Sequence, residues 1–101
     1  MVYKIIWSPR ALDDLREVVR YIRRDNPDAA RRFGEKLIAK AESLSTLPER
    51  GRVIAKFGDP TIREVFQGPY RLAYRICPNP PNVEIARIWH GARSEENLTL
   101  E

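Results

Sequence analysis

Two helix-start signals, each ending in proline, divide the first half of this chain. Ser8-Pro9 and Asn26-Pro27 both put a side chain that can cap a helix directly before proline. Proline fits the first helical position because its missing N–H would be unpaired there in any case. After each signal, apolar residues recur every three or four positions, which is typical of an amphipathic helix. The stripes are Leu12, Leu15, Val19 and Ile22, and then Ala30, Phe33, Leu37, Ala41 and Leu44. The pattern predicts an antiparallel helical hairpin whose second helix stops at Leu47-Pro48.

Segments rich in β-branched and aromatic residues lie on both sides of this hairpin. Residues 2–7 precede it, and residues 61–66, 70–76 and 83–90 follow it, so each predicts a strand. Residues 48–60 hold two glycines and two prolines, which predicts a loop with a short extended piece. Residues 77–82 hold three prolines, and we expect them to interrupt the sheet because proline has no N–H to donate.

The order strand, two helices and three strands predicts an α+β fold, with one small sheet packed on the helical hairpin. A chain of 101 residues has room for one domain, so we expect a single domain over residues 1–101 with a short acidic tail at 94–101. Strict alternation in residues 70–76 assigns apolar and basic side chains to opposite faces of a strand. We expect one core between helices and sheet, made of Leu15, Val19, Phe33, Leu37, Leu72 and Tyr74.

Composition narrows the classes of function. No apolar run approaches the ~20 residues needed to cross a bilayer, and the apolar start is too short for a signal peptide. We therefore expect a cytoplasmic protein without a membrane partner. One cysteine and one histidine cannot build a zinc site, and no glycine-rich phosphate loop or nucleophile elbow is present. We expect no metal and no cofactor.

The second half of the chain is basic up to Arg93, and the tail that follows is acidic. The net charge is +4, and residues 48–93 hold eight basic and four acidic groups, whereas the last eight residues hold three acidic groups and no basic one. The candidate phosphate- or target-binding residues are Arg63, Arg71, Arg75, Arg87 and Arg93. Arginine forks on an exposed sheet face suit phosphates. The alternative is that these arginines only mark the solvent-facing side of the sheet.

The only histidine, His90, stands where the last predicted strand ends, between Trp89 and Gly91. A histidine with a pKa near 6.5 can act as a general acid or base. At a strand end it can equally hydrogen-bond the backbone and brace the turn. We favour the bracing role.

The residues also carry a family resemblance. "SPRALDDLREVVRYI" is similar to the first helix of RelE/ParE-type toxins, and "IREVFQGPYRLAYRI" followed by "VEIARIWHGAR" is similar to their central and last strands. The likeness covers nearly the whole chain in the same order. It implies a toxin of a type II toxin–antitoxin, or plasmid stabilisation, system that is neutralised by a cognate antitoxin. Two targets are open, since RelE-type members cleave mRNA on the ribosome and ParE-type members poison DNA gyrase.

The chain departs from the nuclease pattern at two places. An arginine that those enzymes place before the central turn falls near Phe66, and their late tyrosine falls near Thr99. The resemblance is therefore closer to the ParE-like branch, and we expect a gyrase inhibitor rather than an enzyme. If the chain is instead an mRNA endonuclease, the catalytic candidates are His90, Arg93 and Arg63.

The expected antitoxin contacts lie along the helical hairpin. They are Leu12, Leu15, Val19, Phe33 and Leu37. An antitoxin segment would lay apolar side chains along these residues and fold as it binds. The assembly could be a homodimer or a toxin–antitoxin hetero-oligomer.

Overall fold

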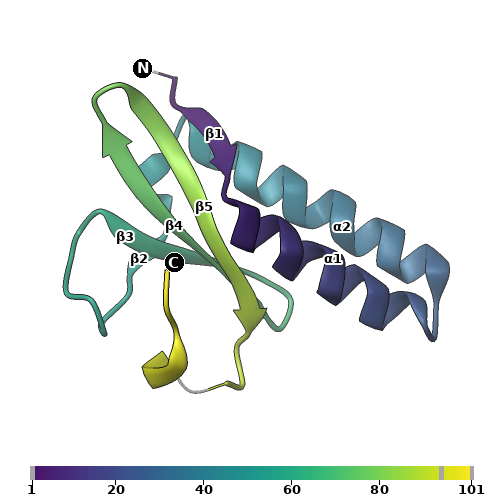
Figure 1. Ribbon diagram of the computed structural model, residues 1–101. Coiled ribbons are helices and arrows are strands. Elements are labelled where there is room, and N and C mark those ends of the chain that lie inside the picture. Colours follow the sequence, from purple (N-terminus) through teal and green to yellow (C-terminus); the bar gives the residue numbers. More distant parts are fainter. Residues whose placement is uncertain (1, 94, 101) are drawn as a thin grey trace.

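The computed structural model describes residues 2–93 and 95–100 and has the α+β architecture expected from the sequence (Figure 1). The main elements are β1 (Lys4–Trp7), α1 (Pro9–Arg23), α2 (Pro27–Glu42), β2 (Arg52–Val53), β3 (Ile62–Gln67), β4 (Tyr70–Pro78) and β5 (Pro81–His90). Short 3-10 turns occur at η1 (Ser43–Ser45), η2 (Pro48–Arg50) and η3 (Glu95–Asn97). The sheet order is β1-β5-β4-β3-β2, with β1 parallel to β5 and the other neighbours antiparallel.

Both helix starts are built as the sequence indicates. The Ser8 hydroxyl oxygen accepts the Ala11 N–H at 3.0 Å, and the Asn26 side-chain oxygen accepts the Ala29 N–H at 3.0 Å. The Ser8 hydroxyl also donates to the Ala86 carbonyl at 3.1 Å, so the start of α1 is attached to β5. The second helix ends at Glu42, before the expected Leu47-Pro48 stop, and continues as the turn η1.

The three-proline segment does not interrupt the sheet, so that expectation was wrong. Strands β4 and β5 remain paired through Cys77–Asn82 and Pro78–Pro81, and the turn between them contains a cis peptide bond at Asn79-Pro80. Pro78 and Pro81 form the last pair before the turn. A missing N–H at that position removes no hydrogen bond from inside the ladder.

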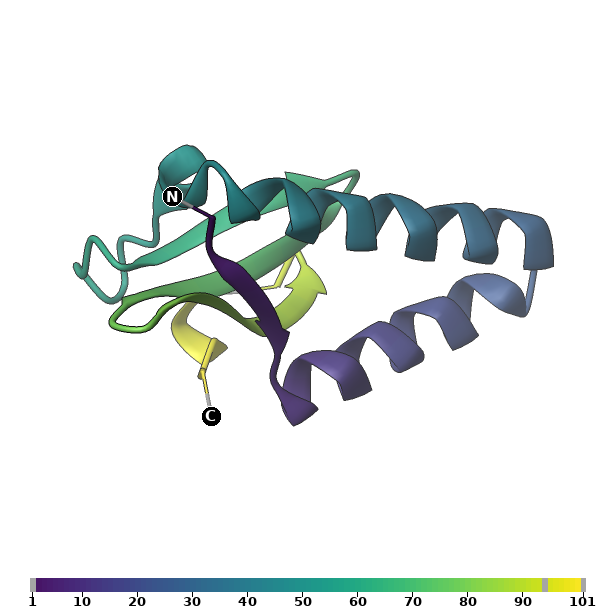
Figure 2. The same ribbon diagram turned by 90° about the horizontal axis from the view of Figure 1, so that it is seen from above.

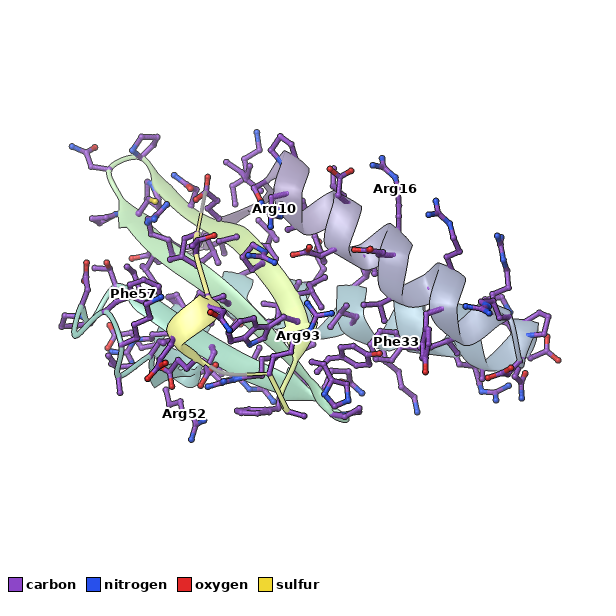
Figure 3. All side chains as sticks on the ribbon, turned by 60° about the horizontal axis from the view of Figure 1, so that its bottom comes forward. Arg10, Arg16, Phe33, Arg52, Phe57 and Arg93 are labelled. Carbon is purple, nitrogen blue, oxygen red and sulfur yellow. The ribbon has the colours of Figure 1, made fainter. Side chains whose placement is uncertain are left out.

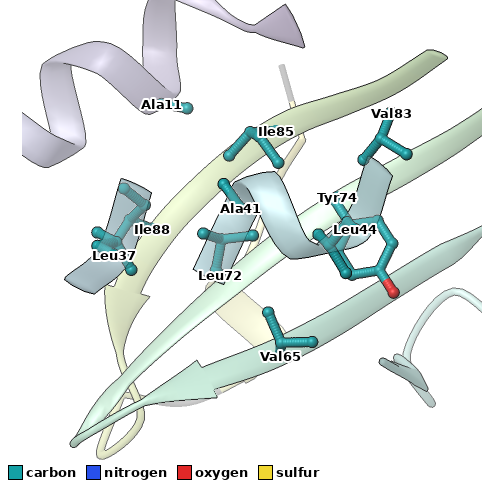
Figure 4. Packing of buried hydrophobic residues seen from close by; sticks show 10 residues of the cluster. All are labelled: Ala11, Leu37, Ala41, Leu44, Val65, Leu72, Tyr74, Val83, Ile85 and Ile88. Atoms are coloured by element: carbon teal, nitrogen blue, oxygen red, sulfur yellow. The ribbon is translucent and has the colours of Figure 1, made fainter. Parts of the chain in front are cut away.

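The main core lies between the helical hairpin and one face of the sheet, as expected (Figure 4). Leu37, Leu72 and Tyr74 are fully buried there, while Leu15 and Phe33 are partly buried and pack against the cluster. Val19, which was also expected there, is not part of the cluster: it is half-buried and lies beside Gly34 of α2, and Val18 packs against the cluster instead.

The other face of the sheet was expected to be wet, and it instead holds a second small core. Ile54, Ile62, Ala73, Trp89 and Leu98 form this cluster, with Phe57 and Leu100 packed against it. Figure 2 shows α2 and the C-terminal segment on opposite sides of the sheet. Residues 95–100 of the expected acidic tail are thus docked on the sheet, because Leu98 fills an apolar site there.

Neighbouring residues of α2 offer a matched test of the main core. Leu37→Ala should lower the free energy of unfolding by about 2–5 kcal/mol, because it leaves a cavity in a fully buried site. Ile38→Ala should change it by less than about 1 kcal/mol, since Ile38 is 45% exposed. Urea denaturation measures both. Equal losses would contradict the position of the core.

Candidate functional site

Two of the five candidate binding arginines are buried in ion pairs, so the expectation of an exposed arginine face is wrong for them. Arg71 and Arg87 are each 7% exposed. Arg71 donates from Nε and Nη2 to the two carboxylate oxygens of Glu64, both at 2.7 Å. These hydrogen bonds raise the pKa of Arg71, so its guanidinium stays charged. Glu64, only 2% exposed, also accepts Arg52 Nε at 2.8 Å.

Arg87 is held by Asp14 of α1. Its Nε donates to Asp14 Oδ2 at 2.8 Å, and the same oxygen accepts the Ile88 N–H at 2.9 Å. Beyond residue 85, β5 no longer pairs with β1, so the Asp14 carboxylate takes the place of a neighbouring strand's carbonyl. Arg87 Nη1 donates to the Thr99 carbonyl at 3.0 Å. One arginine thus joins α1, β5 and the C-terminal segment.

The other strand-borne arginines also have partners within the fold. Arg63 donates from Nε to the Pro60 carbonyl at 2.8 Å and from Nη1 to the Gly51 carbonyl at 2.9 Å. Arg75 donates to Glu84 on β5 at 2.8 Å. These contacts secure the loop before β3 and the β4–β5 pair. Any contact of these two arginines with a target remains a prediction.

Tyr74 anchors the segment before β2. Its hydroxyl donates to the Pro48 carbonyl at 2.6 Å and accepts the Gly51 N–H at 2.9 Å. Burial raises the pKa of the Tyr74 phenol, which therefore stays neutral and able to donate. A Cβ at Gly51 would lie 2.5 Å from the Glu64 carbonyl oxygen, so only glycine fits this close approach.

A hollow with a volume of about 880 Å³ lies between α1 and the end of β5. We call it the α1–β5 groove. Helix α1 contributes Arg10, Asp13, Asp14, Glu17, Val18 and Tyr21, and the strands and the turn after β5 contribute Tyr70, Arg87, Ile88, Trp89, His90 and Arg93. Figure 3 labels Arg10 on the first turn of α1 and Arg93 beyond the end of β5. The groove combines an apolar floor with charges of both signs, which suits a peptide segment.

His90 braces the turn after β5. Its Nδ1 accepts the Ala92 N–H at 3.0 Å, so the neutral ring carries its proton on Nε2. The ring is exposed and meets Tyr70 edge-on, with centroids 5.3 Å apart. This geometry agrees with the bracing role favoured from the sequence.

The residues expected to contact an antitoxin differ in how accessible they are. Leu12, Leu15, Val19 and Phe33 are half-buried, whereas Leu37 is fully enclosed and has no surface to offer. Val18 and Tyr21 line the groove but were not predicted from the sequence as contact residues. Neither was in the stripe chosen from the sequence, although Val18 lies three residues after Leu15 and four before Ile22, and Tyr21 lies three after Val18. This spacing is the signal that would have found them.

No group of three or more His, Cys, Asp or Glu residues lies close enough to hold a metal ion within residues 2–93 and 95–100. In the same residues, no helix is both long and apolar enough to cross a membrane.

Comparison with known proteins agrees with the resemblance seen in the sequence. The model of the family described as the ParE toxin of type II toxin–antitoxin system parDE matches residues 5–95. Toxin RelE1 of Caulobacter vibrioides is 34% identical over 95 residues, which cover 90% of this chain and 96% of that protein. Toxin RelE2 of the same organism is 38% identical over 91 residues, covering 89% and 97%.

Two solved structures share the fold. A chain of the chromosomal ParDE system from P. aeruginosa has a TM-score of 0.70 at 17% identity, covering 88% of this chain and 96% of that one. A chain of the RelBE2 toxin–antitoxin complex from Mycobacterium tuberculosis has a TM-score of 0.67 at 25% identity, covering 92% and 95%. The chain therefore belongs to the ParE toxin family of type II toxin–antitoxin systems, and the family assignment made from the sequence is confirmed.

Asp14 provides the test of how the groove wall is held. Asp14→Ala should lower the free energy of unfolding by about 3–5 kcal/mol, because it leaves a buried guanidinium without its counter-charge. Asp14→Asn should lower it less, since the amide oxygen can still accept the Ile88 N–H. Urea denaturation of both variants gives the two losses.

Asp13→Ala is the matched control, because the neighbouring Asp13 side chain is 71% exposed and pairs with Arg16 at the surface of the same helix. It should lower the free energy of unfolding by less than about 1 kcal/mol. Similar losses for Asp13→Ala and Asp14→Ala would show that the buried contact to β5 is unimportant.

Proposed function

We propose that this chain is restrained by a cognate antitoxin and that the free toxin inhibits growth by poisoning DNA gyrase. The family membership supplies the toxin class. The choice of gyrase depends on one observation, which is that the candidate nuclease residues do not form one site. The second candidate function is ribosome-dependent mRNA cleavage, which the similarity to Toxin RelE1 and Toxin RelE2 favours.

The nuclease candidates are separated along the sheet. Arg63 pairs with Tyr74 of β4, whereas His90 pairs with Tyr70, four residues away along the same strand. At about 3.3 Å per residue, the two positions are ~13 Å apart along β4. Arg63 is also occupied by backbone carbonyls, and His90 Nδ1 already accepts a backbone N–H. Only His90 and Arg93 share a surface, the α1–β5 groove. This arrangement supports gyrase poisoning over general acid–base cleavage of RNA as the function.

The α1–β5 groove is the surface we assign to the antitoxin. Val18, Ile88 and Tyr70 form its apolar floor, and Tyr21 stands at its side with 64% of its surface exposed. Asp13 and Glu17 on α1 face the groove together with Arg10 and Arg93. An amphipathic segment that folds on binding can bury its apolar side chains on this floor and pair its charges at the rim. The solved ParDE and RelBE2 relatives are toxin–antitoxin systems, which supports a partner of this kind.

Tyr21 tests the groove as the antitoxin site. Tyr21→Ala should weaken antitoxin binding by about 10–100-fold, because a buried interface aromatic contributes roughly 1.5–3 kcal/mol. Leu47→Ala is the control, since Leu47 is similarly exposed at 60% but lies away from the groove. Titration calorimetry with the product of the neighbouring reading frame measures both affinities. Unchanged binding by the Tyr21 variant would place the antitoxin elsewhere.

His90 separates the two targets. His90→Asn keeps an acceptor at the position of Nδ1 and should retain growth arrest, while neither it nor His90→Ala can shuttle a proton at neutral pH. His90→Ala should lose about 0.5–1.5 kcal/mol of folding free energy with the turn hydrogen bond. We expect stalled gyrase–DNA complexes and intact mRNA when the toxin is expressed without antitoxin. If both variants instead slow a specific mRNA cleavage by ~10²–10⁴-fold, the protein is a nuclease.

A further inference from the structure

Most positive charges of the second half of the chain are engaged inside the fold. The engaged cations are Arg52, Lys56, Arg63, Arg71, Arg75 and Arg87, each of which donates to a carboxylate or a backbone carbonyl. The excess of basic residues in 48–93 therefore does not create a phosphate-binding face on the sheet. Free positive charge has to be sought elsewhere on the molecule.

One concentration of such charge lies at the far end of the helical hairpin. Residues 20–32, which include the end of α1, the turn and the start of α2, contain five arginines and two aspartates. That gives a net charge of +3, against +4 for the whole chain. Figure 2 shows that the two helices extend well past the sheet and that their connecting turn lies at the distal end. This positive charge therefore lies far from the part of the α1–β5 groove that β5 lines.

Four of these arginines are exposed and uncommitted. Arg20, Arg23, Arg24 and Arg32 make no side-chain hydrogen bond or ion pair within residues 2–93 and 95–100. Arg31 differs, because it donates to Glu35 at 2.7 Å. We call the four uncommitted residues the hairpin-tip arginines.

The helix dipole does not account for all of them. Arg20 and Arg23 lie in the last turn of α1, where a cation is favoured by the partial negative charge of the helix end. Arg32 lies in the second turn of α2, near the helix N-terminus, where the helix dipole does not stabilise a cation. A solvated guanidinium with no internal partner keeps its whole donor fork available for an external anion.

We propose that the hairpin-tip arginines bind the phosphate backbone of a nucleic acid. All four cations are arginines, whose planar forks match phosphate oxygens, and the projecting tip can reach a long polyanion without involving the sheet. Binding of this kind is independent of base sequence and gains from counterion release. The inference stands whether the toxin's target is gyrase or the ribosome, because it concerns a surface separate from the nuclease candidates.

The test is DNA binding by the full-length chain purified without its antitoxin. Fluorescence anisotropy with a labelled 20-base-pair duplex of arbitrary sequence is followed over a range of salt concentrations. The triple variant Arg20→Gln, Arg23→Gln, Arg24→Gln should bind at least about tenfold more weakly at low salt, and its log–log salt slope should fall by about 2–3. Arg32→Gln alone should lower the slope by about 1. Circular dichroism confirms that the variants are folded.

A matched control distinguishes the tip from overall charge. Lys4→Gln, Lys36→Gln and Lys40→Gln together remove the same number of charges from β1 and from α2 nearer the sheet. This variant should keep most of the wild-type affinity and slope. Equal losses for the two triple variants, or no DNA binding by the wild-type chain at low salt, would overturn the proposal. It would also be overturned if the wild type bound poly-glutamate in preference to DNA, since the partner would then be an acidic protein surface.

Discussion

The carboxylate of Asp14 holds the first helix against the last strand, and much of the structure depends on it. Strand β1 is too short to pair with the whole of β5, and the Asp14 oxygen supplies an acceptor where β1 has ended. The same oxygen neutralises Arg87, which in turn donates to the C-terminal segment at Thr99. Removing any one of these partners leaves a buried charge or a buried N–H unpaired, which is costly in a low-dielectric interior.

A second buried carboxylate organises the opposite half of the sheet. Glu64 of β3 binds Arg71 of β4 in a bidentate pair and also accepts from Arg52 of β2. Arg71 lies over the rings of Phe66 and Trp89, so its guanidinium is packed as well as paired. Because Glu64 and Asp14 bind them, Arg52, Arg71 and Arg87 stabilise the fold. These side chains join the strands, α1 and the C-terminal segment to one another. The groove and the hairpin tip are the two surfaces that we assign to partners.

The helices and most strands could be predicted because their signals are local. The Ser8 and Asn26 caps, the three-and-four spacing and the alternation of residues 70–76 each depend on neighbours a few positions away. The face of the last strand could not be predicted in this way. Strict alternation would put Val83, Ile85, Arg87 and Trp89 on one side, but a bulge at Ala86 moves Arg87 and Trp89 to the other face and brings Ile88 into the main core. The bulge lets β5 place Ile88 in the main core and Trp89 in the second core. Both cores exist only in the tertiary structure.

The sequence by itself determined the class of fold, the position of the hairpin and the toxin family, because periodicity, capping and order along the chain are properties of short segments. It also pointed to His90 as a brace, which the Nδ1 contact with Ala92 agrees with. Only the tertiary structure decided which charges are free. Nothing in the sequence distinguishes Arg71 and Arg87 from Arg20 and Arg24. In the structure, Glu64 binds Arg71 from seven residues away, and Asp14 binds Arg87 from 73 residues away. Whether a charge is paired depends on such distant carboxylates, and their approach is fixed by the packing of helix on sheet.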